Sequence, residues 1–470
     1  MKSRVSEVVF VLSSRRSSPQ ATCRKTQLLG FAARACLWLR GFFFLPLFFS
    51  PLFAQNQQLN PDQVFEVVYA LSDELKSRYV DEKVGDQMAQ VLLNRLKTKA
   101  YNTITKPDSL ALVLGNDLQK VKADFHLRVY AGLTNLDRYA DSSDAWSFFN
   151  QDKLENFGLR ETRTLAGGIG YFRLDDFTEW LDARSAIAGA ISSLSFSDAL
   201  IIDFRHNTGG APETMYWLLS YFFDEKSKTE FTGLYFREEG KINKAFVTKK
   251  LEGTRYCKKP VVILTGPNTA SAAEGFAYDM QRLGRAIIIG ESTKGGAQPA
   301  RTYMLPHGFR VLLPIGKAVD PDNGGNWEGK GVVPDIAVKE EAAQMYAEAV
   351  LLDSLGKAGK HAEWYAKLAY RQAVLAHQFS IASDSLNTLT GTFDKREITL
   401  LNGALYYRNT TKTETYSRLL ALPGGGYTFD SETRDLRTAV KLFPKSENGK
   451  ITHLVIHYPS GNEKTLNRTL

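Results

Sequence analysis

The sequence predicts a mixed α/β protein with an N-terminal helical module, an α/β core and a small C-terminal antiparallel β domain. Its 470 residues are 43% hydrophobic and 11% aromatic, so the chain is too long for one ordinary core and too apolar to be disordered. Short β-branched runs alternate with helical stretches through the middle of the chain, and short alternating segments separated by turn residues fill its end. The predicted domains are a signal peptide at 1–54, the helical module at 55–130, the α/β core at 165–345, a helical connector at 346–384 and the small β domain at 385–470.

The first 54 residues have the layout of an export signal. Residues 1–40 hold eight basic residues and one acidic residue, Glu7, and an apolar run of about a dozen residues then leads to Ala54, a small residue suited to cleavage. Pro46 and Pro51 interrupt that run, which is too short to cross a hydrocarbon core of about 30 Å comfortably. An uncleaved anchor is the alternative, and a translation start further along the chain stays open.

The net charge and the cysteine count support different conclusions once this segment is left out. The whole chain has a formal net charge of +8, which would indicate an anionic partner. Without residues 1–54 there remain 51 Lys and Arg against 50 Asp and Glu, so the basicity belongs to the export signal. Of Cys23, Cys36 and Cys257 only the last lies beyond it, which argues against a disulfide framework. The sequence has no Cys/His cluster, phosphate loop or base-stacking platform, so we expect no metal, no cofactor and no nucleic acid partner.

Apolar residues recur at helical spacing soon after the signal segment. Between residues 61 and about 105, Val, Leu and Met lie three and four positions apart, which predicts a small helical module. A polar break follows, with Asp108 or Ser109 as the N-cap of a further helix through Val121. The stretch from 131 to about 164 is polar and irregular.

Between about 165 and 340 the pattern is that of an α/β core with buried strands, because runs such as Ala-Leu-Ile-Ile-Asp are apolar on both faces. A long helical stretch at Glu340–His377, interrupted at Leu355–Lys360, leads out of it. The candidate strands are Ile169–Leu174, Ala199–Phe204, Val261–Thr265, Ala286–Ile289 and Arg310–Pro314, and the candidate helices are Trp180–Leu194, Thr214–Phe222 and Ser271–Leu283.

Hairpin turns dominate the end of the chain. From about Leu389, short alternating segments are separated by Asn402-Gly403, Gly424–Gly426 and Asn448-Gly449, which are typical of turns between antiparallel strands. A small antiparallel β domain is therefore predicted.

Three segments carry candidate catalytic residues, and the first two of them are suited to stabilising an oxyanion. Ser271 stands where a strand passes through a turn of small residues into an amphipathic helix, and unpaired N–H groups and the helix dipole favour negative charge there. Gly209 and Gly210 follow a buried strand and allow backbone N–H groups to approach a ligand. Glu328 is a carboxylate in a glycine-rich turn. Taken singly, these residues have plainer explanations: a helix N-cap, a strand-to-helix turn and a solvated surface charge.

Five motifs occur in order, with compatible spacing. They are Gly170-Tyr-Phe-Arg-Leu, Asp203-Phe-Arg-His-Asn-Thr-Gly-Gly, Thr269-Ala-Ser-Ala-Ala-Glu, Gly290-Glu-Ser-Thr-Lys-Gly-Gly-Ala and Trp327-Glu-Gly-Lys-Gly-Val-Val-Pro-Asp-Ile. Together they resemble the serine peptidase family that contains the C-terminal processing peptidases, the tricorn core and the interphotoreceptor retinoid-binding protein. The resemblance extends over residues 60–345 and implies a crotonase-like α/β core. It also implies Ser271 as nucleophile, with the N–H groups of Ala272, Gly209 and Gly210 as the oxyanion hole.

The resemblance offers two bases for the serine. The processing peptidases use a lysine 25 residues after the nucleophile, where this chain has Gly296, and the nearest lysine, Lys294, comes two positions earlier. From the sequence we also expect the chain to lack the PDZ insert of that type. The retinoid-binding and tricorn type uses His and Glu, and Asp124-Phe-His126-Leu-Arg-Val resembles its histidine motif. His126 is thus implied as general base and Glu328 as the residue that orients it, since serine needs a base within hydrogen-bond reach.

Three positions near this set leave alternatives open. His206, in the expected oxyanion loop, is the rival base. Phe125 stands where the tricorn type has a serine, so Glu328 would act on the histidine through water or only by its field. Lys294 stands where a small residue is usual; it is a solvated charge, a contact to the substrate's C-terminal carboxylate or a displaced base.

The favoured function is an exported bacterial serine peptidase, periplasmic or extracellular, that acts through an acyl-enzyme on Ser271. The alternative is a non-catalytic binding protein that holds a hydrophobic small ligand in the same core. The expected partner is a peptide or protein substrate, with no membrane span once the signal is removed, and the oligomeric state stays open. The C-terminal β domain resembles the lipocalin-like modules of bacterial hydrolases.

Overall fold

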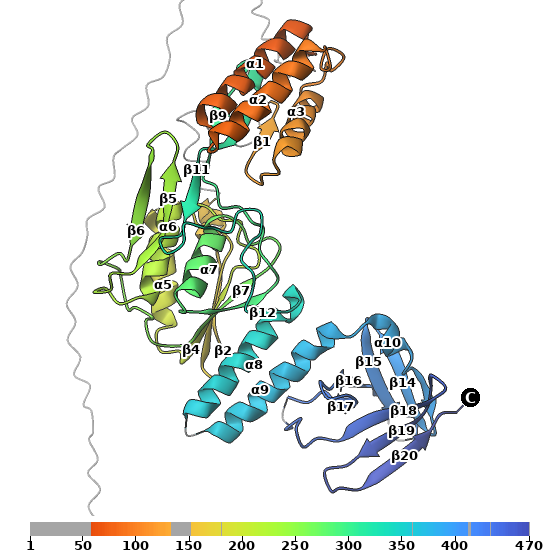
Figure 1. Ribbon diagram of the computed structural model, residues 1–470. Coiled ribbons are helices and arrows are strands. Elements are labelled where there is room, and N and C mark those ends of the chain that lie inside the picture. The colour runs from red at the N-terminus through yellow and green to blue at the C-terminus, as the bar shows by residue number, and fades with distance from the viewer. Residues whose placement is uncertain are drawn as a thin grey trace, which may run out of the picture. The chain divides into compact units, whose positions relative to one another are not determined.

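The computed structural model describes residues 58–132, 152–179, 181–359, 361–411, 415–432 and 434–469 (Figure 1). The predicted signal peptide, with Cys23 and Cys36, lies outside these residues, as does Trp180. None of the helices in the described ranges is long and apolar enough to cross a membrane.

A six-stranded sheet organises the α/β core, in the order β12-β8-β7-β4-β3-β2. Neighbouring strands from β12 to β3 run parallel, and only β2 is antiparallel to its neighbour. The strands predicted at Ile169–Leu174 and Val261–Thr265 have these bounds, because both runs are buried on both faces of the sheet. The strands are β2 (Leu159–Leu165), β3 (Ile169–Leu174), β4 (Ala199–Asp203), β7 (Val261–Thr265), β8 (Ile287–Gly290) and β12 (Ile336–Ala337).

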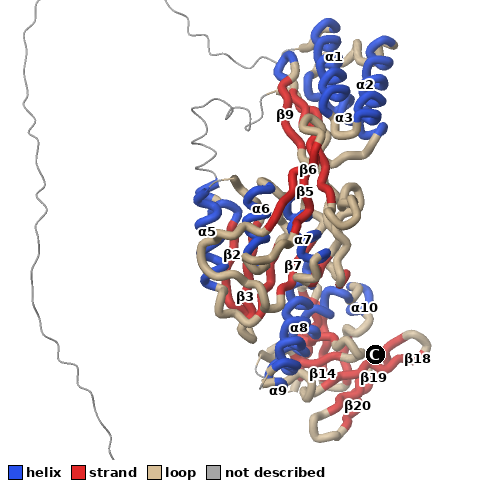
Figure 2. The backbone as a smooth tube through the Cα atoms, turned by 60° about the vertical axis from the view of Figure 1, so that its left-hand side comes forward, coloured by secondary structure: helices blue, strands red, loops and turns tan. Residues whose placement is uncertain are grey.

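Helices cover both faces of this sheet. Ile202 and Ile263 pack on one face against α5, α6 and α7, and their neighbours Ile201 and Val262 pack on the other face against α8 and α9. Figure 2 shows α5, α6 and α7 beside the strands of this sheet. Neighbouring residues of a strand point to opposite faces of the sheet, and both faces are covered by apolar helices. The strand sequences therefore have few polar positions. The helices are α5 (Leu181–Ser193), α6 (Pro212–Leu219), extended by a 3-10 turn at Ser220–Phe222, α7 (Ala272–Arg282), α8 (Glu340–Ala358) and α9 (Ala362–His377).

The N-terminal helices pack on a separate three-stranded sheet in the order β1-β10-β9. The strand predicted at Arg310–Pro314 lies here and not in the central sheet, because its buried Val311 and Leu313 join the helical module's core. The third helix begins at Pro107 after Lys106, so neither Asp108 nor Ser109 caps it. The elements are α1 (Pro61–Arg78), α2 (Glu82–Lys97), α3 (Pro107–Val121), β1 (Arg128–Tyr130), β9 (Ala300–Met304) and β10 (Arg310–Pro314).

A second small sheet, in the order β11-β5-β6, adjoins the core and was not predicted. Its outer strand is largely exposed and mostly polar, so the sequence lacks the apolar pattern that would predict a strand there. The strands are β5 (Glu230–Phe236), β6 (Lys241–Phe246) and β11 (Gly316–Val319).

The C-terminal domain is an eight-stranded antiparallel sheet that nearly closes into a barrel. An isolated bridge between Phe393 and Arg468 joins its two ends, with a hydrogen bond from Thr469 N–H to Thr392 O (2.8 Å). The predicted turns at Asn402-Gly403 and Asn448-Gly449 join hairpins, and all four residues have positive φ, as tight two-residue turns require. The strands are β13 (Gly391–Phe393), β14 (Arg396–Leu401), β15 (Ala404–Asn409), β16 (Ser417–Ala421), β17 (Tyr427–Phe429), β18 (Lys441–Glu447), β19 (Lys450–His457) and β20 (Glu463–Asn467).

Candidate active site

Ser271 lies in the sharp turn between β7 and α7, with backbone angles φ 53° and ψ −119°. Positive φ is unfavourable for a residue with a side chain, so the neighbouring structure must hold it in place. Gly209 is part of that structure, because a Cβ added there would lie 2.7 Å from Ser271 Cβ. The close approach of these two backbones requires glycine at 209.

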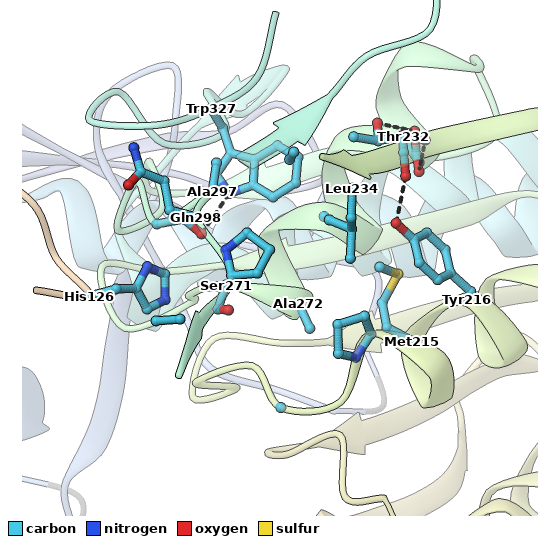
Figure 3. Close-up of a pocket in the computed structure, with 18 of the residues that line it drawn as sticks. His126, Met215, Tyr216, Thr232, Leu234, Ser271, Ala272, Ala297, Gln298 and Trp327 are labelled. Atoms are coloured by element: carbon cyan, nitrogen blue, oxygen red, sulfur yellow. Dashed lines mark hydrogen bonds between the residues drawn. The ribbon is translucent and has the colours of Figure 1, made fainter. Parts of the chain in front are cut away.

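Ser271 and His126 line one cavity of about 230 Å³ (Figure 3). Its remaining walls are largely apolar. The one carboxylate on its wall, Asp279, is fully buried and already accepts hydrogen bonds from Thr232 and Arg282, so it offers no free charge to a ligand. The apolar walls come from Met215, Leu234, Ala297, Ala318 and Trp327, with Tyr216 beside them.

Two backbone N–H groups beside Ser271 are free to bind an oxyanion. Within the described residues, neither Gly210 N–H nor Ala272 N–H has a hydrogen-bond partner, and both residues line the cavity. Gly209 N–H instead donates to Asn207 Oδ1 (2.9 Å), so Gly209 provides the close approach and not a free donor. Asn207 is fully buried and also donates to Leu174 O (3.0 Å), which anchors the glycine loop to β3.

His126 sits in a loop fixed by buried hydrogen bonds. Its backbone N–H donates to Asp124 Oδ1 (3.0 Å), and Asp124 Oδ2 accepts from Tyr79 OH (2.8 Å). The Gln119 side chain brackets the loop, accepting from Asp124 N–H and donating to the carbonyl oxygens of Asp124 and Leu127 (2.8–2.9 Å). These contacts come from α1 and α3, so the helical module positions the imidazole.

Burial lowers the pKa of His126 below 6.5; the Asp124 carboxylate raises it and the Arg128 charge lowers it further. The imidazole is therefore neutral at pH 7, the state that a general base requires. Its Nδ1 is enclosed without a hydrogen-bond partner in the described part of the chain. Among the described atoms no hydrogen bond joins His126 to Ser271 Oγ, and such bonds often form only when substrate is present.

Gly296 is the position at which the processing peptidases carry lysine. A Cβ added there would lie 2.7 Å from His126 Cε1, so the imidazole occupies the space that a side chain at 296 would need. Lys294, the nearest lysine, is exposed, and its Nζ lies 5.2 Å from the centroid of the Phe125 ring. Lys294 is absent from the cavity that holds Ser271.

Glu274 links the serine to the loop beneath His126. This fully buried carboxylate accepts hydrogen bonds from the N–H groups of Ser271 (2.7 Å), Gly295 (2.6 Å) and Gly296 (2.8 Å), and from Thr293 Oγ1 (2.5 Å). Burial raises its pKa, and the four donors lower it. Glu274 was not assigned from the sequence, although Ser-x-x-Glu at the start of a helix is a capping-box pattern that could have found it.

Glu328 does not bond to His126. Its Oε2 accepts from Ala297 N–H (2.6 Å), and it lines neighbouring cavities with Lys122 and Asp124 but not the cavity of Ser271. Burial raises the Glu328 pKa to about 7, the Ala297 bond opposes this and the Asp124 charge adds to it. Glu328 and His126 therefore share no direct hydrogen bond among the described residues, and the action of Glu328 on His126 through water or by its field stays a prediction.

His206, the rival base, is exposed and lies outside the cavity. Its Nε2 is 3.6 Å from Glu340 Oε1 at the start of α8. A second residue that was not assigned from the sequence, Gln298, lines the cavity beside His126, and no sequence pattern would have identified it.

Similarity to known proteins identifies the α/β core as that of a serine-type peptidase. Residues 168–338 match the model of peptidase family S41, and this segment belongs to that family. Over 338 residues the chain is 25% identical to the carboxy-terminal processing protease CtpA of Bacillus subtilis, covering 70% of this chain and 67% of that protein.

The chain is also similar to two further proteins, over different fractions of their lengths. The carboxyl-terminal-processing protease of a Picosynechococcus species is 27% identical over 175 residues, which are 37% of this chain and only 40% of that protein. The solved structure of the photosystem II D1 C-terminal processing protease aligns with a TM-score of 0.39 at 15% identity, over 60% of this chain and 94% of that chain.

Proposed function

We propose that this protein is an exported serine peptidase that hydrolyses peptide bonds through an acyl-enzyme on Ser271, with His126 as general base. One observation carries the proposal: Ser271, held at positive φ at the start of α7, lines a single cavity with His126 and with the free N–H groups of Gly210 and Ala272. Nucleophile, base and oxyanion donors are the parts that acyl transfer needs.

In the first half-reaction Ser271 Oγ attacks the carbonyl carbon of the peptide bond and passes its proton to His126 Nε2. The carbonyl oxygen becomes an oxyanion and accepts hydrogen bonds from Gly210 N–H and Ala272 N–H. His126 then gives the proton to the leaving amine, the C–N bond breaks and the acyl chain stays esterified to Ser271.

In the second half-reaction His126 takes a proton from water, and the resulting oxygen nucleophile attacks the ester carbon. The same two N–H groups hold the second oxyanion. Collapse of this intermediate breaks the ester bond and returns the proton from His126 to Ser271 Oγ, which releases a carboxylic acid product.

The walls of the cavity favour an apolar side chain next to the scissile bond. Met215, Leu234 and Trp327 supply contacts without a free charge, and a space of about 230 Å³ suits a small or medium side chain. Outside the cavity, we assign the exposed ammonium of Lys294, which lies over the Phe125 ring, as a contact to a carboxylate of the substrate. Glu328 acts on the imidazolium by its charge, since it makes no bond to the ring.

The His and Glu pair, with glycine at 296, favours the retinoid-binding and tricorn type of the family. A crotonase-like core and export through residues 1–54 belong to the same proposal.

Replacement of the nucleophile tests the proposal. We expect Ser271→Ala to abolish hydrolysis of peptides with an apolar residue before the scissile bond, and labelling by a fluorophosphonate probe, while circular dichroism stays unchanged. Ser227→Ala, at a serine that does not line the cavity, is the control and should retain both. Full hydrolysis by Ser271→Ala would refute the serine mechanism. Absence of labelling in the native protein, with an apolar ligand that co-purifies, would establish the binding protein instead.

A further inference from the structure

One ring nitrogen of His126 needs a partner that Glu328 does not provide. Nδ1 is enclosed and unpaired within the described residues, while Glu328 Oε2 accepts from Ala297 N–H (2.6 Å). If Nε2 is to receive a proton from Ser271, Nδ1 must carry the ring's own proton. A buried N–H group without an acceptor is destabilising, so the active arrangement requires an acceptor on this side of the ring.

A buried acceptor without a partner lies on the wall of the same cavity. The Gln298 side chain is 6% exposed, and its Oε1 makes no hydrogen bond to any described residue. Gln298 lines the cavity of Ser271 and His126, and also the cavity of about 590 Å³ that includes Glu328. The two unpaired atoms are complementary, because Nδ1–H donates and an amide oxygen accepts.

The backbone places Gln298 on the required side of the imidazole. The carbonyl oxygens of Ala297 and Pro299 accept hydrogen bonds from Ala318 N–H and Ile315 N–H (2.8 and 2.9 Å), and such pairing of alternate residues with a neighbouring segment is typical of extended chain. In an extended chain positions 296 and 298 share a face. A Cβ added at Gly296 would lie 3.4 Å from His126 Nδ1, so this shared face is turned toward that nitrogen. Figure 3 shows Gln298 and the serine on different sides of the ring.

We propose that Gln298 is the positioning residue of His126. Its Oε1 accepts the proton of Nδ1, directly or through one ordered water, and so holds Nε2 toward Ser271. This inference rests on the proposed function, because only a base needs a fixed tautomer. Glu328 then influences the imidazolium without touching it.

Two substitutions separate orientation from packing. Gln298→Met keeps the volume and removes the acceptor, so we expect kcat to fall about 10- to 100-fold with KM changed less than about twofold. Gln298→Glu restores an acceptor, retains most of kcat and raises the pH of half-maximal kcat by about one unit, because a carboxylate stabilises the imidazolium. Gln87→Met, on the exposed face of α2, is the control and changes neither. A rise in KM alone would make Gln298 a substrate contact and overturn the proposal.

Nitrogen-15 NMR of histidine-labelled protein provides a readout independent of turnover. We expect His126 to carry its proton on Nδ1 in the native protein and in Ser271→Ala, and to shift toward the Nε2–H tautomer in Gln298→Met. A high-resolution crystal structure would distinguish direct contact from a bridging water. An unchanged tautomer in an active Gln298→Met would overturn the proposal and leave the peptidase intact. Hydrolysis that survives Ser271→Ala would instead refute the proposed function, and the tautomer would still report on the contact.

Discussion

At the scale of single residues, burial shifts the pKa values of the His126 imidazole and of the nearby Glu328 carboxylate in opposite directions. Burial lowers the pKa of His126 and raises the pKa of Glu328 to about 7. Both shifts favour the neutral group, because each side chain leaves water without a counter-charge in contact. The base is thus ready at mildly acidic pH, whereas Glu328 gains its charge only near neutrality.

The pH dependence of turnover should therefore have two steps. Activity appears as the pH rises through the lowered pKa of His126, below 6.5, and rises again near pH 7 as Glu328 ionises and stabilises the imidazolium. We expect Glu328→Gln to keep the first step and lose the second in a profile of kcat/KM. A single step above pH 6.5 in both proteins would contradict this assignment.

Glu328 also makes stability depend on pH. Its pKa in the folded protein, about 7, lies above the ordinary 4.5, so the folded state holds the proton more tightly than the unfolded state. The resulting stabilisation is present below about pH 4.5 and is lost as the pH rises through 7. Glu328→Gln keeps an acceptor for Ala297 N–H and has no such loss. We expect its Tm to exceed that of the native protein by more at pH 8 than at pH 5; an offset independent of pH would contradict the assignment.

Sequence reasoning selected residues of the site unevenly. Ser271 and His126, 145 positions apart, were selected through the resemblance and line one cavity. Glu274 and Gln298 were not, since their importance lies in contacts between segments that the sequence does not show to be adjacent. Glu328 was expected to act on His126 only through water or by its field, because Phe125 stands where a hydroxyl would link them, and the two side chains share no hydrogen bond in the described part of the chain.

At the scale of elements, one carboxylate fastens α7 to the loop at 293–296. Glu274 lies in the first turn of the helix and accepts four hydrogen bonds, which fix the serine at one end and Gly296 at the other. The positive φ of Ser271 and the position of Gly296 against the His126 ring therefore both depend on the buried carboxylate of Glu274.

We expect Glu274→Gln to destabilise the fold by about 2–4 kcal/mol. The amide NH₂ group of glutamine would face N–H groups that now donate to the carboxylate, and these buried N–H groups would lose their acceptor. Activity falls with it as the serine and Gly296 lose their position. Glu348→Gln is the matched control: Glu348 is 5% exposed on α8 and has one side-chain partner, Gln344, which an amide can retain. Urea unfolding measures both variants, and equal losses would show that Glu274 has no special role.

Strands with two buried faces were predicted well, and amphipathic ones poorly. β3, β7 and β10 have the predicted bounds because their short, continuous apolar runs are typical of buried strands. The β5–β6 hairpin was missed because its outer strand is mostly polar. The sheet that β10 joins could not be inferred, since its partners β1 and β9 are defined by pairing over long sequence separations.

At the scale of the whole molecule, the hairpin of α8 and α9 connects two cores. α8 packs on the central sheet through Ala343 and Ala347, whereas α9 contacts the C-terminal domain through Val374. Gln378, just after α9, exchanges two hydrogen bonds with the backbone of Ala421 (2.8 and 2.9 Å). All the proposed catalytic residues lie on the core side of this connector.

Breaking the second contact should leave catalysis intact. Val374→Asp places a carboxylate in a fully buried apolar cluster with Leu420 and Leu436, which we expect to loosen α9 from the β domain. Hydrogen exchange should increase in β16 and the chain up to β18, with unchanged protection in β7 and α7 and an unchanged kcat. Loss of protection in the central sheet would show that the two cores unfold together.

The closure of the C-terminal sheet also constrains the order of folding. β13 pairs with the chain that follows β20, through Thr469 N–H to Thr392 O (2.8 Å), and Asp394 N–H, just after β13, donates to Asn467 O at the end of β20 (2.8 Å). The first strand of the domain therefore stays incomplete until residues near the end of the chain are available. Contacts of such long sequence separation form slowly, because a large loop must close before they can stabilise anything. The strands of the peptidase core pair over longer separations still, as between Arg128 and Leu312, but all of them precede residue 338 and none pairs with the end of the chain. During synthesis the peptidase core can thus mature while the barrel is still open, and the unpaired edge of β13 is exposed to mispairing during that interval.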